Sequence, residues 1–279
     1  MPTVPKTLHP RRRVDYLESG SGPAVILVHS SMAGARQWKA LTAELEPDYH
    51  VRAVNLFGYG ATPPWPHASR PSLDDYADLV AAAIPHGIRN IKLIGHSFGG
   101  AVAMRVAQRE GSRIGSLVLI EPSLFPLLRT SGRDDAFTEI QTLARDTLQQ
   151  IANAQPEHAA ARFIDYWCGV GSWASMPDHR RTSTLAAITQ LSAEWPALLE
   201  HRTTIAELQQ TLPSNTLLMS FSDSVRPSRE VADILAHAFP YWLVVTIAYA
   251  GHMAPLTHPH LVNAVIREFL AETRTALVA

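Results

Sequence analysis

A single serine stands among glycines in the sequence GHSFGG, residues 95–100. A serine hydroxyl becomes a nucleophile only where it is exposed, held in place and next to a base, and a sharp turn between a strand and a helix can provide that position. Gly95 and Gly99 leave room for such a turn, because a glycine has no Cβ to clash with a close neighbour. The apolar run before the motif and the alanine-rich run after it predict the strand and the helix. We therefore predict that Ser97 is a catalytic nucleophile.

A nucleophilic serine needs a base, and the base needs an acid that fixes its orientation. Among the 13 histidines, His252 follows the last predicted strand, so its loop should lie at the same edge of the sheet as Ser97. Two carboxylates, Asp223 and Glu121, each follow a predicted strand and should reach the same edge. We predict that Asp223 is the acid, and Glu121 remains its rival.

Short apolar runs alternate with helical patterns over most of the chain. The runs predict strands at residues 14–18, 24–29, 51–54, 91–94, 117–120, 216–221 and 243–248. The helical patterns predict helices at residues 37–45, 73–84, 101–108, 228–238 and 259–270. Ser72 should cap the second of these helices, with Asp75 completing the cap. Strands that alternate with helices predict an α/β fold built on a mostly parallel, doubly wound sheet.

The stretch from residue 122 to residue 213 departs from this alternation. It is mostly helical in pattern and contains the aromatic-rich sequence FIDYWCGVGSW, residues 163–173. We interpret residues 122–213 as a helical insertion in a core made of residues 1–121 and 214–279. The aromatic and other large apolar side chains expected to lie above Ser97 are Phe125, Tyr166, Trp167, Trp173, Met176 and Trp195.

Composition excludes several functional classes. The 279 residues are 46% hydrophobic and 18% charged, and the net charge is -1, so the chain has no basic field that would attract nucleic acid. No apolar run is long enough to span a bilayer, and the first ten residues lack the apolar segment of a secretory signal. With a single cysteine as well, the chain is predicted to be cytoplasmic and to have no membrane partner. The sequence leaves open whether the chain forms a homodimer.

The motifs together resemble those of the α/β-hydrolase superfamily. The order of nucleophile, acid and histidine in that family is met by Ser97, Asp223 and His252. The family's turn motifs have counterparts in HSSM at residues 29–32, NLFGYG at residues 55–60 and SFSDSVRP at residues 220–227. The last of these favours Asp223 over Glu121, and the insertion falls where the family carries a helical cap.

The resemblance also implies an oxyanion hole and a mechanism. The backbone N–H groups of Ser31 and Phe98 should stabilise the oxygen that becomes negative in the tetrahedral intermediate. Ser30 departs from the family pattern, which has glycine after the early histidine. The implied reaction proceeds through an acyl-enzyme that water hydrolyses, so it requires neither an organic cofactor nor a metal.

The implied substrate is a small molecule of small to medium size that is partly hydrophobic. We predict a carboxylic-ester hydrolase, with lactones and thioesters as related substrates. One alternative is hydrolysis of a carbon–carbon bond in a ring-cleavage product, and a second is acyl transfer to an acceptor other than water. A third is a non-catalytic ligand receptor on the same fold. A serine at position 97 argues against the dehalogenases and epoxide hydrolases of this family, which use an aspartate nucleophile.

Overall fold

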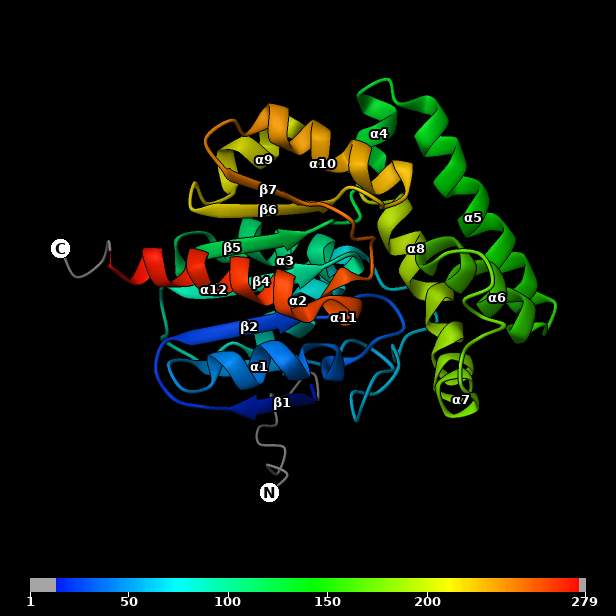
Figure 1. The fold of residues 1–279 in the computed structure, drawn as a ribbon, viewed down its shortest axis with the longest axis horizontal. Coiled ribbons are helices and arrows are strands. Elements are labelled where there is room, and N and C mark those ends of the chain that lie inside the picture. Colours follow the sequence, from blue (N-terminus) through cyan, green and yellow to red (C-terminus); the bar gives the residue numbers. More distant parts are fainter. Residues whose placement is uncertain (1–13, 276–279) are drawn as a thin grey trace.

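The computed structural model describes residues 14–275 and places a seven-stranded sheet at the centre of the molecule (Figure 1). The strands are β1 (Tyr16–Ser19), β2 (Ala24–Val28), β3 (His50–Val54), β4 (Ile91–His96), β5 (Ile114–Ile120), β6 (Thr216–Phe221) and β7 (Leu243–Ile247). Their order across the sheet is β1-β3-β2-β4-β5-β6-β7. Only the β1–β3 pair is antiparallel within the described residues. The predicted α/β class and the mostly parallel, doubly wound sheet are confirmed.

Helices cover both faces of this sheet. One face carries α1 (Lys39–Leu45) and α12 (Pro259–Thr275), and the other carries α2 (Leu73–Ala83), α3 (Phe98–Glu110) and α10 (Arg226–Ala238) (Figure 1). Side chains of β2 alternate between the two cores: Ile26 and Val28 pack on the α2–α3 side, and Val25 and Leu27 on the α1–α12 side. Because both faces of the sheet are covered at its centre, β2 is apolar throughout, as the sequence pattern indicated.

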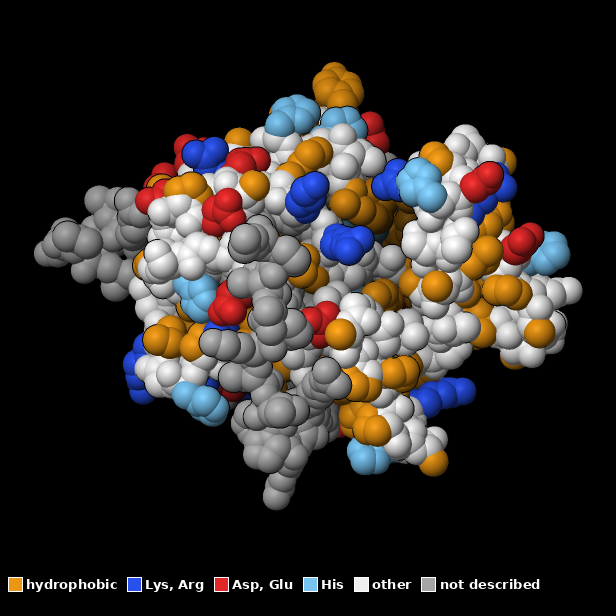
Figure 2. All heavy atoms as spheres, turned by 90° about the horizontal axis from the view of Figure 1, so that it is seen from below, with side chains coloured by type: hydrophobic (Ala, Val, Ile, Leu, Met, Phe, Trp, Pro, Cys, Tyr) orange, Lys and Arg blue, Asp and Glu red, His pale blue; other side chains and the backbone are white. Residues whose placement is uncertain are grey.

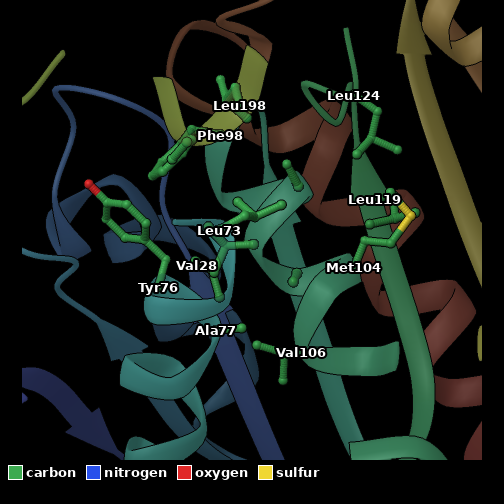
Figure 3. Packing of buried hydrophobic residues seen from close by; sticks show 14 of the residues in the cluster. Val28, Leu73, Tyr76, Ala77, Phe98, Met104, Val106, Leu119, Leu124 and Leu198 are labelled. Atoms are coloured by element: carbon green, nitrogen blue, oxygen red, sulfur yellow. The ribbon is translucent and has the colours of Figure 1, made fainter. Parts of the chain in front are cut away.

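The start of α2 forms as the sequence predicted. The Ser72 hydroxyl accepts a hydrogen bond from the Asp75 N–H, and the Asp75 carboxylate accepts one from the Ser72 N–H. From this start α2 directs Tyr76 and Ala77 into the core, where they meet residues of α3 (Figure 3). The Tyr76 ring packs edge-on against the ring of Phe98, with ring centres 4.9 Å apart. This contact fixes the first residue of α3, which follows Ser97 directly.

Six α-helices lie between β5 and β6 in the chain. They are α4 (Pro126–Thr130), α5 (Asp134–Ala152), α6 (Pro156–Cys168), α7 (Asp178–Ala187), α8 (Leu191–Leu199) and α9 (Ile205–Thr211). The first five, α4 to α8, lie beyond the carboxyl ends of the parallel strands, whereas α9 packs beside α3 (Figure 1). We call α4 to α8 the inserted helices. They share one continuous core with the α2–α3 face of the sheet.

The described residues contain no helix that is both long enough and apolar enough to cross a membrane. The first ten residues, from which we predicted the absence of a secretory signal, lie outside the described part of the chain. On the face shown in Figure 2, acidic and basic side chains of the described residues are interspersed, and neither sign forms a continuous patch.

Candidate active site

Ser97 occupies the turn between β4 and α3, at the carboxyl edge of the sheet. Its backbone is in the left-handed region, with φ 55° and ψ -120°, a conformation that costs free energy in a residue other than glycine. Neighbouring glycines make the turn sterically feasible: a Cβ on Gly95 would lie 2.3 Å from the Gly99 oxygen, and one on Gly99 would lie 2.3 Å from the backbone oxygens of Val28 and His29. The chain thus holds the Ser97 hydroxyl out of the regular backbone at the start of a helix.

The structure brings His252 to Ser97, as the sequence predicted. His252 lies in the loop after β7, and its Nε2 is 2.9 Å from the Ser97 Oγ. The ring of Trp167, from α6, covers the imidazole, with ring centres 4.3 Å apart. Only 3% of His252 is exposed, so this contact is shielded from bulk water.

Glu121, and not Asp223, lies at the other nitrogen of His252. The Glu121 Oε2 accepts a hydrogen bond from the His252 Nδ1 at 2.6 Å, so that Nε2 is left to accept a proton from Ser97. Glu121 is the residue directly after β5, and its backbone is left-handed with φ 40°. The Ser224 hydroxyl donates to Oε2 at 2.6 Å and the Phe221 N–H donates to Oε1 at 3.1 Å, so both carboxylate oxygens are held.

The prediction that Asp223 orients His252 is therefore wrong in this structure. The Asp223 side chain is exposed, and its Oδ1 accepts a hydrogen bond from the neighbouring Ser222 hydroxyl at 2.7 Å. The Asp223 backbone does contribute to the site, because its N–H donates to the Ala250 oxygen at 3.0 Å and ties the turn after β6 to the loop that carries His252. The position of Glu121, immediately after the strand beside β4, marked it in the sequence as a rival acid but did not separate it from Asp223.

A buried chain of hydrogen bonds links the loop that follows β2 to the loop that carries His252. Both the N–H and the hydroxyl of Ser30 donate to the Gln37 Oε1, at 3.0 and 2.8 Å. The Gln37 amide donates to the His96 Nδ1 at 3.1 Å, and the His96 Nε2 donates to the His252 backbone oxygen at 2.9 Å. Burial holds the pKa of His96 well below its usual range, which keeps the ring neutral as this chain requires. Sequence reasoning missed Gln37, which no local motif marks.

His29 also stabilises the loop that follows β2. The His29 Nδ1 donates to the Ser30 oxygen at 2.7 Å, and its Nε2 accepts from the Leu56 N–H at 3.1 Å. Burial lowers the pKa of His29 to about 4, so the ring is neutral near pH 7. His29 therefore supports the loop and is not placed to transfer a proton with Ser97.

The N–H groups of Ser31 and Phe98 have no hydrogen-bond partner in the described part of the chain. The Phe98 N–H belongs to the first turn of α3, where N–H groups lack partners within the helix and the helix dipole favours negative charge. Ser31 lines the same cavity as Ser97. The Ser30 hydroxyl, by contrast, already donates a hydrogen bond to the Gln37 side chain.

Ser97 and His252 line a cavity between the sheet and the inserted helices. Three of the aromatic residues predicted to lie above Ser97 line it, namely Phe125, Trp167 and Trp195, whereas Tyr166, Trp173 and Met176 do not. The sequence did not single out the remaining members of the wall, which include Ser123, Phe163, Leu191, Glu194, Leu198 and Met253. The Ser123 Oγ lies 3.2 Å from the Ser97 Oγ.

Glu194 is a buried carboxyl in this wall. Only 1% of it is exposed, and the Tyr59 hydroxyl donates to its Oε1 at 2.7 Å. Burial raises the pKa of Glu194 from 4.5 to about 7, although the hydroxyls of Ser31 and Tyr59 oppose the shift. The folded chain therefore binds a proton at Glu194 over a pH range in which the unfolded chain has released it.

This shift predicts a loss of stability as the pH rises from about 4.5 to about 7. The loss should amount to about 3 kcal/mol, because one pKa unit corresponds to roughly 1.4 kcal/mol. Glu194→Gln should remove this pH dependence. The free energy of unfolding of the variant, relative to that of the wild type, should therefore rise by about 2 to 3 kcal/mol from pH 5 to pH 8. Urea unfolding at the two pH values measures this gain. Glu200→Gln, at an exposed position just after the same helix, is the matched control, and equal pH dependence in wild type and Glu194→Gln would contradict the assignment.

In the described residues, no group of three or more His, Cys, Asp or Glu side chains is arranged to hold a metal ion.

Known proteins share this architecture. Over 92% of its length the chain is 22% identical to haloalkane dehalogenase 2 of Mycobacterium bovis, covering 91% of that protein. It is 24% identical to the pimeloyl-[acyl-carrier protein] methyl ester esterase of Aeromonas salmonicida, over 90% of this chain and 96% of the esterase. Among solved structures, a thermophilic esterase from Thermogutta terrifontis superposes with a TM-score of 0.73 at 22% identity, over 93% of both chains.

The sequence model of the alpha/beta hydrolase family matches residues 25–265, from β2 into α12, and so spans the parallel sheet and the inserted helices. With the turn at Ser97, the sheet order and this match in agreement, the chain belongs to the alpha/beta hydrolase family.

Proposed function

We propose that this alpha/beta hydrolase cleaves a carboxylic ester, or a related lactone or thioester, through an acyl-enzyme formed on Ser97. The observation that carries the proposal is the continuous contact from the Ser97 Oγ to the His252 Nε2, at 2.9 Å, and from the His252 Nδ1 to the Glu121 Oε2, at 2.6 Å. This geometry matches what serine activation requires: a nucleophile and a base in hydrogen-bond contact, with the base oriented by an acid.

The proposed reaction has two halves. The Ser97 Oγ attacks the carbonyl carbon while His252 takes the hydroxyl proton, and Glu121 stabilises the imidazolium that results. The alcohol or thiol then leaves with the proton from His252. Water attacks the acyl-enzyme along the same route, which releases the acid and restores the Ser97 hydroxyl.

The N–H groups of Phe98 and Ser31 form the proposed oxyanion hole. Both lack another partner in the described residues, and the first of them lies at the positive end of α3. Donors of this kind lower the barrier because they are already in place where negative charge develops.

The inserted helices form the proposed cap, and the aromatic wall of the cavity supports a small to medium, partly hydrophobic substrate. The family resemblance implies an aspartate nucleophile in dehalogenases. This chain has Ser97 at that position, so similarity to the dehalogenase does not support carbon–halogen cleavage here. The esterase relative agrees with the proposed ester chemistry.

Turnover of matched substrates tests this proposal. The purified chain should hydrolyse 4-nitrophenyl acetate and butyrate and should leave the dienone acids of carbon–carbon hydrolases intact. Because acylation precedes deacylation, nitrophenolate release should begin with a burst that is stoichiometric with enzyme whenever the second step is slower. Cleavage of dienone acids without ester turnover would contradict the proposed ester chemistry, and ligand binding without any turnover would support a receptor.

A further inference from the structure

The cavity beside Ser97 contains one carboxyl that the proposed reaction does not use. Glu194 belongs to α8, whose residues Leu191, Trp195 and Leu198 line the same cavity. These positions lie three, one and four residues from Glu194, so a single face of the helix presents one carboxyl among apolar side chains.

The hydrogen bonds of Glu194 are incomplete. Its Oε1 accepts from the Tyr59 hydroxyl, whose oxygen in turn accepts from the Met32 N–H at 2.8 Å, so Tyr59 has no further proton to donate. Its Oε2 is buried and has no hydrogen-bond partner of good geometry among residues 14–275, although the Ser31 hydroxyl lies close enough to act on the carboxyl. In that part of the chain no other carboxylate oxygen is left buried in this way, and no Lys, Arg or His forms an ion pair with Glu194.

A buried carboxyl oxygen without a donor is costly. The desolvation of one unsatisfied polar atom costs about 1 to 3 kcal/mol, and more when the group is charged. A leucine would fit the same helix without that cost, and the apolar side chains that line the cavity beside Glu194 offer it no hydrogen bond. Pockets that bind small molecules commonly combine apolar walls with a few polar groups that orient the ligand. A ligand that donates a hydrogen bond to the Glu194 Oε2 would therefore account for a carboxyl at this position.

We propose that the Oε2 of Glu194 binds a hydrogen-bond donor of the substrate, a hydroxyl or an ammonium group carried on an otherwise apolar acyl or alcohol part. This inference rests on the proposed function, because it names the substrate class of the same site. It predicts that the enzyme prefers esters with one such donor over isosteres in which a methyl or ethyl group replaces it.

Pairs of matched esters, assayed at pH 8 where Glu194 is ionised and Oε2 can only accept, test the preference. The probes are 4-nitrophenyl esters of phenylacetic and 3-phenylpropanoic acids that carry, at ring position 3 or 4, hydroxyl against methyl and ammoniomethyl against ethyl. In at least one pair the kcat/KM of the donor ester should exceed that of its isostere by about tenfold or more, because a site built for a donor rejects the analogue that lacks it. The ratio within each pair is the readout, so a general change in activity does not affect it.

Two variants assign the preference to Glu194. Glu194→Leu should reduce every ratio to about one or below. Glu194→Gln keeps a carbonyl oxygen but not the charge, so it should retain a hydroxyl preference and lose an ammonium preference, which tells the two donors apart. Glu200→Gln, an exposed change just after the same helix, should keep the wild-type ratios.

A binding measurement separates this inference from the proposed function. The corresponding N-methyl amides, which resist hydrolysis, are titrated calorimetrically into wild type and Glu194→Leu. If no ester is turned over but the donor amides still bind more tightly to wild type than their isosteres do, the ester chemistry is wrong and the Glu194 site stands. Ratios at or below one in every pair for wild type, or ratios that survive in Glu194→Leu, would overturn the inference.

Discussion

Ser97→Ala is expected to lower kcat/KM for 4-nitrophenyl butyrate by about 10⁴- to 10⁶-fold, which is the loss typical when a nucleophilic serine is removed. The physical reason is that no other group in hydrogen-bond contact with the His252 Nε2 can form the acyl-enzyme. Residual activity over water should remain, because the N–H groups of Phe98 and Ser31 and the cavity are unaffected. Steady-state kinetics with active-site titration of the wild type measures the loss.

Ser123 provides the informative comparison. Its Oγ lies 3.2 Å from that of Ser97 and lines the same cavity, but it has no contact with His252 among the hydrogen bonds of the described residues. Ser123→Ala should therefore cost at most about tenfold, the effect of one lost hydrogen bond. A loss in Ser123→Ala as large as that in Ser97→Ala would show that the two hydroxyls share the role, and undiminished turnover in Ser97→Ala would refute the nucleophile assignment.

The second large effect is expected at Glu121. Glu121→Gln should lower kcat by about 10³- to 10⁴-fold, because a neutral amide does not stabilise the imidazolium as the carboxylate does and has only one oxygen that can accept a hydrogen bond. KM should change little, because Glu121 does not line the cavity. The kinetic signature is thus a loss in kcat with binding retained, measured on the same ester.

Asp223→Asn is the matched control for the acid. The Asp223 side chain is exposed and accepts from Ser222, so the isosteric change should alter kcat by no more than about threefold. The reverse pattern, a large loss in Asp223→Asn with Glu121→Gln near wild type, would show that the acid observed at His252 in the structure is not the one used in the reaction.

Much of the fold follows from local patterns in the sequence. The run at residues 91–94 predicted a buried strand, and β4 extends to His96. The capping residues Ser72 and Asp75 fixed the start of α2 to the residue, because the cap depends only on side chains three positions apart. Helix α10 begins at Arg226, two residues before the predicted start, which is within the usual uncertainty of a helix end.

The acid could not be chosen from local patterns. Glu121 and Asp223 follow β5 and β6, which are neighbours in the sheet, so both backbones reach the carboxyl edge. What separates them is the direction of each side chain after the strand. The left-handed backbone at Glu121 and the hydrogen bonds donated by Phe221 and Ser224 hold its carboxylate at the His252 Nδ1. The turn after β6, in contrast, exposes the side chain of Asp223. These contacts join residues about 100 positions apart in the chain.

The burial of Glu194 in the cavity wall could not be predicted from local patterns either. In the sequence LSAEWPALL, residues 191–199, a glutamate is what a solvent-exposed helix position would carry. Its burial depends on Tyr59, 135 residues earlier in the chain, and on the packing of α8 over the sheet edge. Gln37 is buried by long-range contacts of the same kind, with His96 59 residues away.

The most direct measurement is to locate the covalent bond. The chain is treated with a fluorophosphonate, which reacts with activated serines, and intact mass with peptide mapping then identifies the modified residue. We predict one phosphonyl group per chain, on Ser97, still present in Ser123→Ala and absent in Ser97→Ala. Stoichiometric modification at Ser123 or at any other residue, with Ser97 unmodified, would contradict the account.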